Sequence, residues 1–232
     1  ILYFKRSEIN MKIATWNIER PEKTGARVQH LINCLKEIDA DILILTESNE
    51  AVLFGSDYNY FHTDILEELF YNEGERRTSI YSKYSLLGTL PTFRADTSIC
   101  TKLKTPFGDL AVYGTVIGIN GNRRKNFDAD LVKQLEDFEK ISANENICIG
   151  GDLNMTFSDN YYHTQEGRLK LNNSFNKLKL TNLTADIPEN IDHIIISDAF
   201  MKDKAVKLFE WNRDKKLSDH IGVCVTITET CN

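Results

Sequence analysis

The sequence predicts an α/β domain whose sheets are covered on their faces. Two observations support this: segments of strand character alternate with segments of helix character along the 232 residues, and several strands are apolar throughout. A strand that is apolar on both sides is buried on both faces, as in a layered domain. The length suits one domain, and no repeat, linker or low-complexity tract divides it.

The expected strands are short apolar runs bounded by polar or turn residues. Residues 12–16 form the first, and residues 42–45 are wholly apolar, which predicts burial on both faces. A turn at residues 106–109 separates two later strands. The full set of expected strands is 12–16, 42–45, 79–82, 98–104, 110–117, 146–149, 194–196 and 223–227.

Three segments carry apolar residues at helical spacing. In residues 26–38 the apolar side chains from Val28 to Ile38 recur at intervals of one, three or four residues and form one stripe. Residues 128–141 and 167–178 show similar stripes. These helices are expected to cover the sheet faces.

The charge balance limits the classes of function. The chain has 28 Lys and Arg against 34 Asp and Glu, a net charge of −6. Proteins that coat DNA through charge alone are usually basic, so a broad phosphate-neutralising surface is disfavoured, whereas a local basic strip stays compatible. No apolar run is long enough for a transmembrane helix, and no amphipathic segment suits membrane insertion.

The cysteines and the N-terminal residues indicate a reducing compartment. Five cysteines lack any CxxC pair and are expected to be small apolar residues of a cytoplasmic protein. Residues 1–10 do not form a signal peptide and are expected to be an upstream segment. Met11 would make a natural start, and the domain is expected to span residues 11–232.

Carboxylates recur next to the predicted strands. They are Glu19, Glu47, Asp152, Asp192 and Asp219. If they converge, their like charges require a cation or shared protons. Oxygen ligands suit Mg²⁺, Mn²⁺ or Ca²⁺ rather than zinc, and no zinc spacing such as HExxH is present. Any one of these residues alone is more often a turn or helix-capping residue, and only the whole set indicates a metal site.

The order of five motifs resembles the endonuclease/exonuclease/phosphatase superfamily. The motifs are Thr15-Trp16-Asn17-Ile18-Glu19, Leu45-Thr46-Glu47-Ser48, Ile149-Gly150-Gly151-Asp152-Leu153-Asn154, Ile191-Asp192-His193-Ile194 and Ser218-Asp219-His220. The resemblance spans residues 11–228. It implies a four-layer α/β sandwich, with two mixed sheets face to face and helices on the outside, and a metal-dependent phosphoester hydrolase.

The resemblance also implies a metal site. Glu47 matches the principal ligand, while Glu19 and Asp219 match further acidic positions beside the metal. The expected cofactor is Mg²⁺, with Mn²⁺ as a plausible substitute. Asn17 matches a residue that contacts this site or the scissile phosphate.

The remaining matches imply catalytic roles. Asp152 matches the residue that orients or deprotonates the attacking water. Asn154 matches a residue that positions water and phosphate. His220 matches the histidine that donates a hydrogen bond to the phosphoryl oxygen, and Asp192 matches the carboxylate that orients it. His193 would point to the opposite face of its strand from Asp192, so we expect it to be structural.

Many members of this family carry a His or Tyr that helps to hold the phosphate or leaving group, at the end of the strand that here covers residues 112–117. This sequence departs from that pattern because it has no His there. Tyr113 and Thr115 are the candidates to replace it. Basic side chains are expected to contact substrate phosphates, although such runs are often solvated loops. The residues expected to bind substrate are Arg77, Arg123 and Arg124, and Arg76, Lys83 and Lys125 are further candidates.

Three functions are compatible with these residues. The first is a nuclease, favoured by the basic strip and by residues 161–163, whose rings could stack on a base or pack on the surface. The second is a hydrolase of a small or lipid-borne phosphate ester, such as an inositol phosphate, a nucleotide or sphingomyelin. The third, a non-catalytic binding module, is disfavoured because it needs few of the acidic and His positions. No obligate protein partner is evident.

Overall fold

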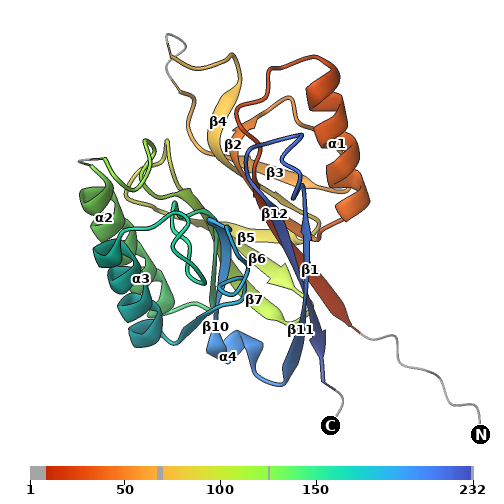
Figure 1. Ribbon diagram of the computed structural model, residues 1–232. Helices are drawn as coiled ribbons and strands as arrows, with labels where there is room; N and C mark the ends of the chain where they lie inside the picture. Colours follow the sequence, from red (N-terminus) through yellow and green to blue (C-terminus); the bar gives the residue numbers. More distant parts are fainter. Residues whose placement is uncertain (1–8, 67–69, 125, 231–232) are drawn as a thin grey trace, which may run out of the picture.

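The computed structural model describes residues 9–66, 70–124 and 126–230 as a four-layer sandwich (Figure 1). The first sheet has the strand order β11-β12-β1-β2-β4-β3. Its strands are β1 (Asn10–Asn17), β2 (Ile42–Asn49), β3 (Asn59–His62), β4 (Glu75–Ser82), β11 (Lys204–Trp211) and β12 (Gly222–Glu229).

The second sheet has the order β5-β6-β7-β8-β10-β9. Its strands are β5 (Ser85–Leu90), β6 (Ile99–Thr105), β7 (Gly108–Val116), β8 (Ile147–Asp152), β9 (Leu180–Asn182) and β10 (Asp192–Ser197). Both sheets are mixed, because β1 pairs parallel to β2 and β7 parallel to β8 while the other pairs are antiparallel.

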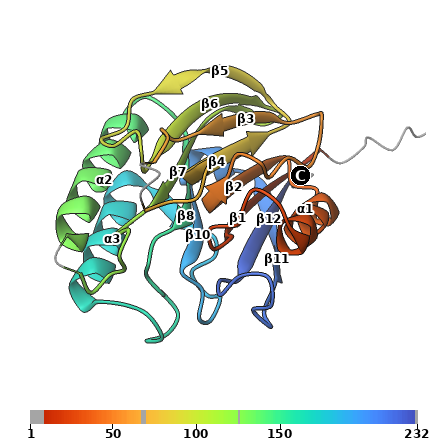
Figure 2. The same cartoon turned by 90° about the horizontal axis from the view of Figure 1, so that it is seen from above.

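Helices cover the two outer faces, as the view from above shows (Figure 2). Helix α1 (Ala26–Ile38) packs Leu31 and Leu35 with Trp16 of the first sheet. Helices α2 (Phe127–Ser142) and α3 (Gln165–Leu178) cover the second sheet, and a short α4 (Asp198–Met201) follows β10. The predicted arrangement of two mixed sheets with outer helices is confirmed.

Successive residues along a strand alternate between the apolar core shared by the two sheets and the apolar core beneath the helices. Ile13, Ile44, Val112 and Ile194 belong to one buried cluster shared by both sheets. Their neighbours along each strand belong instead to the clusters beneath α1 or beneath α2 and α3. Period-two alternation with both faces apolar therefore produces strands that are buried on two sides.

The three longer helices lie within two residues of their predicted bounds, whereas several strands were missed. Strands β3, β5, β9 and β11 and helix α4 were not expected. Strand β11 is exposed over most of its length and is held by pairing with β12 from Lys204 to Trp211. Strand β5 is interrupted by Gly88, where its register with β6 shifts. Neither β5 nor β11 therefore shows the long apolar run by which the other strands were predicted.

The four cysteines in the described part of the chain are free thiols; three are buried and Cys34 is partly exposed. Cys231 and residues 1–8 lie outside the described residues. Within the described residues, every helix is too short or too polar to span a lipid bilayer.

Candidate active site

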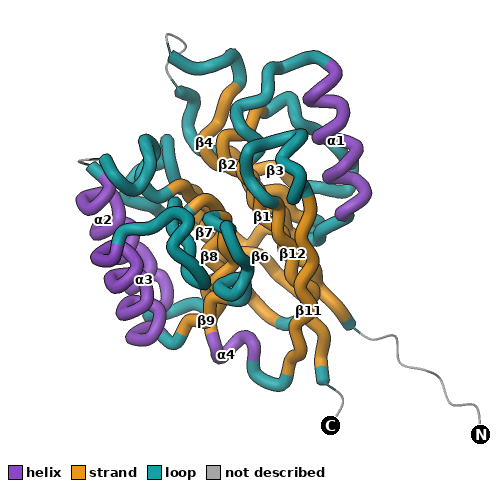
Figure 3. The backbone as a smooth tube through the Cα atoms, in the orientation of Figure 1, coloured by secondary structure: helices purple, strands orange, loops and turns teal. Residues whose placement is uncertain are grey.

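The strand ends that carry the predicted site residues meet at one end of the sandwich. Loops gather at this end between α1 and the α2/α3 pair (Figure 3). Asn17 ends β1 and Asp152 ends β8, while Asp192 begins β10, which runs antiparallel to β8. The register places Asp192 directly beside Asp152. The fold therefore brings residues of distant motifs into one acidic cluster. Its members are Asn17, Glu47, Asp152, Asp192, Asp219 and His220.

His220 is held by the Asp192 carboxylate. Its Nδ1 lies 2.6 Å from Asp192 Oδ2, and Asp192 is fully buried. Burial alone would lower the pKa of His220, but Asp192, Asp152 and Asp219 outweigh it and raise that pKa to about 10. The imidazole is therefore a cation at neutral pH, with Nδ1 directed at Asp192.

Asp152 lies next to this pair. Burial is the main cause that raises the pKa of its carboxyl well above the ordinary value, and the nearby Asp192 and Glu47 add to the rise. Its Oδ1 accepts the Asn154 backbone N–H at 2.8 Å, and its Oδ2 accepts the Asn17 amide at 3.2 Å. Such a carboxylate is oriented and has the basicity of a general base near neutral pH.

Hydrogen bonds fix the β11–β12 loop, which carries His220, to β1 of the same sheet. The Ser218 hydroxyl donates to the Asn17 carbonyl at 2.7 Å and accepts the His220 backbone N–H at 3.1 Å. The Trp16 indole donates to the His220 carbonyl at 3.1 Å. Ser218 belongs to the Ser218-Asp219-His220 motif, but its role in fixing the loop depends on contacts that only the fold reveals.

Glu47 lies on β2, which continues through this residue instead of ending at residue 45. Its φ of 47° is in the left-handed region, an uncommon conformation for a non-glycine residue. Burial raises the pKa of Glu47, with a further rise from Asp219; the Asn17 amide, His220 and Arg20 oppose it. The side chain thus joins the acidic cluster.

The donor set fits a divalent cation. Asp219 raises the pKa of Glu47, and Glu47 raises that of Asp152, so a bound cation would relieve this repulsion between like charges. Within the described residues, no three His, Cys, Asp or Glu side chains close on one point. Glu47, with Asn17 and Asp219 nearby, could hold a hard cation that keeps water and substrate oxygens as its other ligands.

Glu19 and Asp219 are more exposed than the rest of the cluster. The Glu19 side chain is 52% exposed and lies 3.4 Å from Arg27. Asp219 is 69% exposed, and its Oδ1 lies 3.6 Å from His220 Nε2. The structure thus brings Asp219 to the cluster and directs Glu19 toward α1.

Asn154 supports the neighbouring loop. Its amide donates to the carbonyls of Ile117 at 3.1 Å and Gly118 at 3.2 Å, and its own carbonyl accepts the Asn122 amide. Only its side-chain oxygen remains for water or substrate. Asn122 was not anticipated, because a lone asparagine in a loop carries no motif signal.

His193 lies on the other face of β10, as expected. It is fully buried, with Nε2 2.8 Å from the Met155 carbonyl and Nδ1 3.0 Å from the Thr184 hydroxyl. Burial lowers the pKa of His193 to about 4. Its contacts are those of a neutral structural histidine.

Tyr113 and Thr115 are directed away from the cluster. Both side chains face α2: the Tyr113 hydroxyl donates to Asp137 at 2.9 Å, and the Thr115 hydroxyl donates to Gln134 at 2.8 Å. The alternation along β7 instead turns Gly114 toward the other sheet and places Val116 in a pocket with Glu47. Neither candidate touches the cluster in this geometry.

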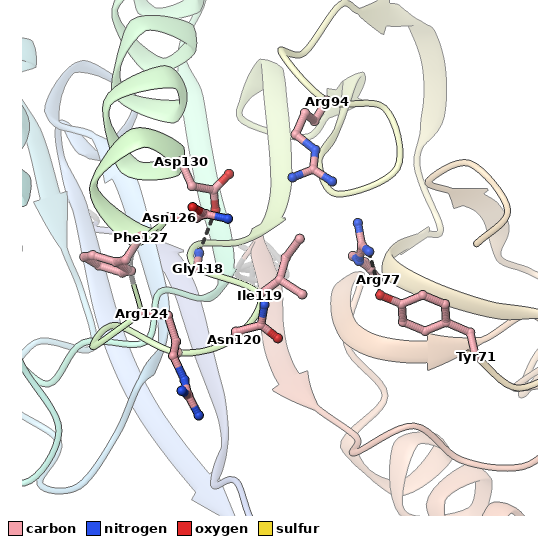
Figure 4. Close-up of a pocket in the computed structure, with 11 residues that line it drawn as sticks. Tyr71, Arg77, Arg94, Gly118, Ile119, Asn120, Arg124, Asn126, Phe127 and Asp130 are labelled. Atoms are coloured by element: carbon pink, nitrogen blue, oxygen red, sulfur yellow. Dashed lines mark hydrogen bonds between the residues drawn. The ribbon is translucent and has the colours of Figure 1, made fainter. Parts of the chain in front are cut away.

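Two connected clefts open beside Glu47. The nearer, of about 310 Å³, is lined by Arg20, Glu47, Tyr71 and Arg77 among others. The second, of about 720 Å³, shares Tyr71 and Arg77 with it and adds Arg94 and Arg124 (Figure 4). Tyr71 and Arg94 were missed because they lie in loops without any motif.

The other described basic residues that were predicted to bind substrate lie at different places in the fold, outside the large cleft. Arg123 lines a small pocket at the start of α2 instead of the large cleft. Arg76 pairs with Glu50, and Lys83 pairs with Asp39 beyond the far end of β4. Lys125 lies outside the described residues.

A third cleft, of about 240 Å³, opens on the His220 side. Its lining includes Tyr161, Tyr162, Lys215, Asp219 and His220. Tyr161 is 55% exposed and lies beneath the Lys215 ammonium, 5.3 Å from the ring centroid. His163 lines a separate pocket on α3. The cluster thus has accessible space on two sides.

Comparison with solved structures finds the same fold. A protein described as endonuclease/exonuclease/phosphatase from Beutenbergia cavernae DSM 12333 aligns with a TM-score of 0.68 and 15% identity, over 95% of this chain and 72% of that one. The endonuclease domain of TRAS1, a telomere-specific non-LTR retrotransposon, aligns with a TM-score of 0.70 and 13% identity, over 94% of this chain and 98% of that one. Humanized D. rerio TDP2 with 14 mutations aligns with a TM-score of 0.63 and 13% identity, over 94% of this chain and 98% of that one.

Comparison with curated protein sequences gives no significant match. A family-level comparison, in contrast, matches residues 14–220 to the Endonuclease/Exonuclease/phosphatase family. That range begins in β1 and ends at His220, so it contains every strand end that forms the cluster. The chain therefore belongs to the Endonuclease/Exonuclease/phosphatase family of phosphoester hydrolases.

Proposed function

We propose that the chain is a divalent-metal-dependent phosphodiesterase that cleaves nucleic acid. The observation that carries this proposal is the His220–Asp192 pair beside Asp152, with open clefts on both sides. A phosphodiester has two substituents, and a site with space on two sides can accept both.

Asp152 is suited to activate water. Its raised pKa lets the carboxylate accept a proton from the attacking water near neutral pH, while Asn17 and the Asn154 N–H fix its orientation. The proton ends on an Asp152 oxygen. The new bond forms between the water oxygen and phosphorus as the bond to the leaving oxygen breaks.

His220 is suited to stabilise the charge that develops on the phosphoryl oxygens. Its Nδ1 is engaged by Asp192, so Nε2–H is the donor that remains for substrate. Because its pKa is about 10, His220 carries this proton at neutral pH. The buried Asp192 fixes the ring and favours its cationic form.

A divalent cation at Glu47, Mg²⁺ or Mn²⁺, would neutralise charge on the phosphate and its leaving oxygen. Glu47 would be its main protein ligand, with Asn17 and Asp219 close by. Glu19 is a less direct contributor, because its carboxylate is paired with Arg27.

Nucleic acid is the preferred substrate class because of the groups that line the clefts. Arginines line the Glu47 side, and Tyr161, Tyr162 and Lys215 line the His220 side. Cationic grooves with aromatic rings suit a strand with phosphates and bases. The similarity of fold to the TRAS1 endonuclease domain agrees with this assignment.

The test compares kcat/KM with Mg²⁺ for single-stranded DNA, duplex DNA, a nucleotide, an inositol phosphate and sphingomyelin vesicles. The proposal expects cleavage of DNA to exceed that of the small and lipid esters. A clear preference for one of those esters would replace the nuclease assignment.

A further inference from the structure

The large cleft beyond Glu47 contains cationic side chains that the reaction itself does not use. Arg77, Arg94 and Arg124 line it, against a single lining carboxylate, Asp130 (Figure 4). The cleft is continuous with the pocket of Glu47 through Tyr71, Arg77, Ile119 and Asn120. A substrate held at Glu47 could therefore extend into it.

Two of these arginines are fixed in place by the protein. Asp96 accepts Arg94 through Nε at 3.0 Å and Nη2 at 2.8 Å, and it also accepts Arg77 Nη1 at 2.5 Å. Arg77 Nη2 donates to the Tyr71 hydroxyl at 2.7 Å. One carboxylate thus serves two guanidinium groups and leaves them incompletely neutralised.

Arg124 differs from both. Among the described residues it has no ion-pair or side-chain hydrogen-bond partner, and it is exposed at the cleft. Asp130 interacts electrostatically with Arg94 and Arg77 and forms no ion pair with Arg124 among the described residues, so Asp96 and Asp130 together leave one of the three cations unbalanced. The cleft thus has an excess of positive charge at Arg124.

We propose that Arg124, with Arg77 and Arg94, forms a subsite for a second phosphate on the same nucleic-acid strand, farther from the site than the scissile phosphate. This inference rests on the proposed nuclease function and extends it. Planar guanidinium groups suit phosphate oxygens. The cleft, at about 720 Å³, is far larger than a phosphate and leaves room for the attached nucleotide.

The test measures equilibrium binding of a short single-stranded oligonucleotide in chelator, so that binding is read without cleavage. Arg124→Ala is expected to weaken binding about tenfold, the effect of one charged hydrogen bond. The slope of log Kd against log salt should fall by about 0.7 in magnitude for one lost phosphate contact. Lys133→Ala, which removes one exposed cation from α2, is the charge-matched control and should leave both values unchanged.

A set of oligonucleotides with one neutral methylphosphonate at successive positions locates the phosphate. In the wild type one position should weaken binding more than its neighbours, and in Arg124→Ala that position should lose its effect. Equal effects of Arg124→Ala and Lys133→Ala, or the same positional pattern in both proteins, would overturn the subsite. Tighter binding of an inositol polyphosphate that depends on Arg124 would overturn the assignment to a strand.

Hydrolysis separates failure of the subsite from failure of the function. Bis(p-nitrophenyl) phosphate has no second phosphate, so the loss of kcat/KM in Arg124→Ala should be about tenfold larger on the oligonucleotide than on this substrate. Cleavage of DNA with no effect of Arg124→Ala would reject the subsite alone. Arg124-dependent binding without cleavage under Mg²⁺ or Mn²⁺ would reject the proposed function alone.

Discussion

At the scale of single residues, the charge state of His220 depends chiefly on the Asp192 carboxylate. Asp192 lies 2.6 Å from Nδ1, is fully buried, and makes the largest contribution among the three carboxylates that together outweigh the cost of burying a cation. Without the Asp192 carboxylate, burial would be opposed only by Asp152 and Asp219, and the pKa of His220 would fall. The donor proton at Nε2 is therefore a property of the pair.

Asp192→Asn is expected to lower the pKa of His220 from about 10 and to reduce kcat at neutral pH by at least about 10²-fold. Because the cationic ring is the donor, the alkaline loss of activity should move to lower pH. An NMR titration of the His220 ring and a pH–rate profile measure both effects. An unchanged ring pKa would contradict the role given to Asp192.

His193 predicts a separate pH dependence of stability. Its folded-state pKa is about 4 against an ordinary value of 6.5, so the unfolded chain binds the extra proton between these values. The contribution, about 3 kcal/mol at most, is complete above pH 6.5 and is lost as the pH falls toward 4.

Urea unfolding from pH 7 to pH 4 tests this prediction. In His193→Gln the free energy of unfolding should be lower at pH 7, since the buried contacts change, but should fall less steeply toward pH 4. Parallel profiles for the two proteins would show that His193 is not buried in its neutral form.

At the scale of elements, close packing at β8 fixes where Asp152 lies. Gly151 has φ 131°, and an added Cβ would lie 1.9 Å from the Thr115 carbonyl oxygen of β7. Backbone atoms cannot move aside as a flexible side chain can. The glycine before Asp152 therefore sets the spacing of the parallel β7–β8 pair.

Gly151→Ala is expected to destabilise the fold by more than about 2 kcal/mol through this clash and the unfavourable φ. Gly88→Ala is the matched control, because Gly88 has φ 159° and no atom lies within 4 Å of its Cβ position. Urea midpoints measure both variants. Similar losses in the two would mean that the Thr115 contact has no special cost.

The sequence predicted buried elements better than exposed ones. Helix α1 occupies the predicted residues 26–38 because its apolar stripe matches its buried face. Strand β11 has no such stripe, since it is stabilised by pairing with β12. Local periodicity records burial, and an exposed edge strand leaves no periodic signal.

Prediction of the site was likewise uneven: residues within motifs could be predicted, whereas residues that depend on strand register or loop folding could not. Motif order identified Asp152, Asp192 and His220, and the structure brings these three together. Spacing along β7 could not show that Tyr113 and Thr115 face α2, because the register of a strand is set by its partners. Loop residues such as Arg94 enter the cleft only through tertiary folding.

At the scale of the whole molecule, the site forms only where the two sheets meet. Glu47 comes from the first sheet and Asp152 from the second, so a cation held near both should stabilise their packing. Binding to the folded state alone raises stability with ligand concentration.

Mg²⁺ is accordingly expected to raise the Tm of the wild type in a concentration-dependent way. Glu47→Gln should lose most of this rise while folding normally, since the substitution keeps the shape of the side chain. Thermal unfolding with and without Mg²⁺, with K⁺ at matched ionic strength as control, gives the comparison. An equal rise in both proteins would contradict the ligand role of Glu47.

The central claim is that this cluster hydrolyses phosphodiesters with a divalent metal. The most direct measurement is cleavage of labelled single-stranded and duplex DNA at low salt with Mg²⁺, with Mn²⁺ and with chelator, by the wild type and by His220→Ala. We expect metal-dependent cleavage by the wild type and a loss of at least about 10²-fold in His220→Ala. Cleavage that persists in chelator, or that is equal in the two proteins, would contradict it.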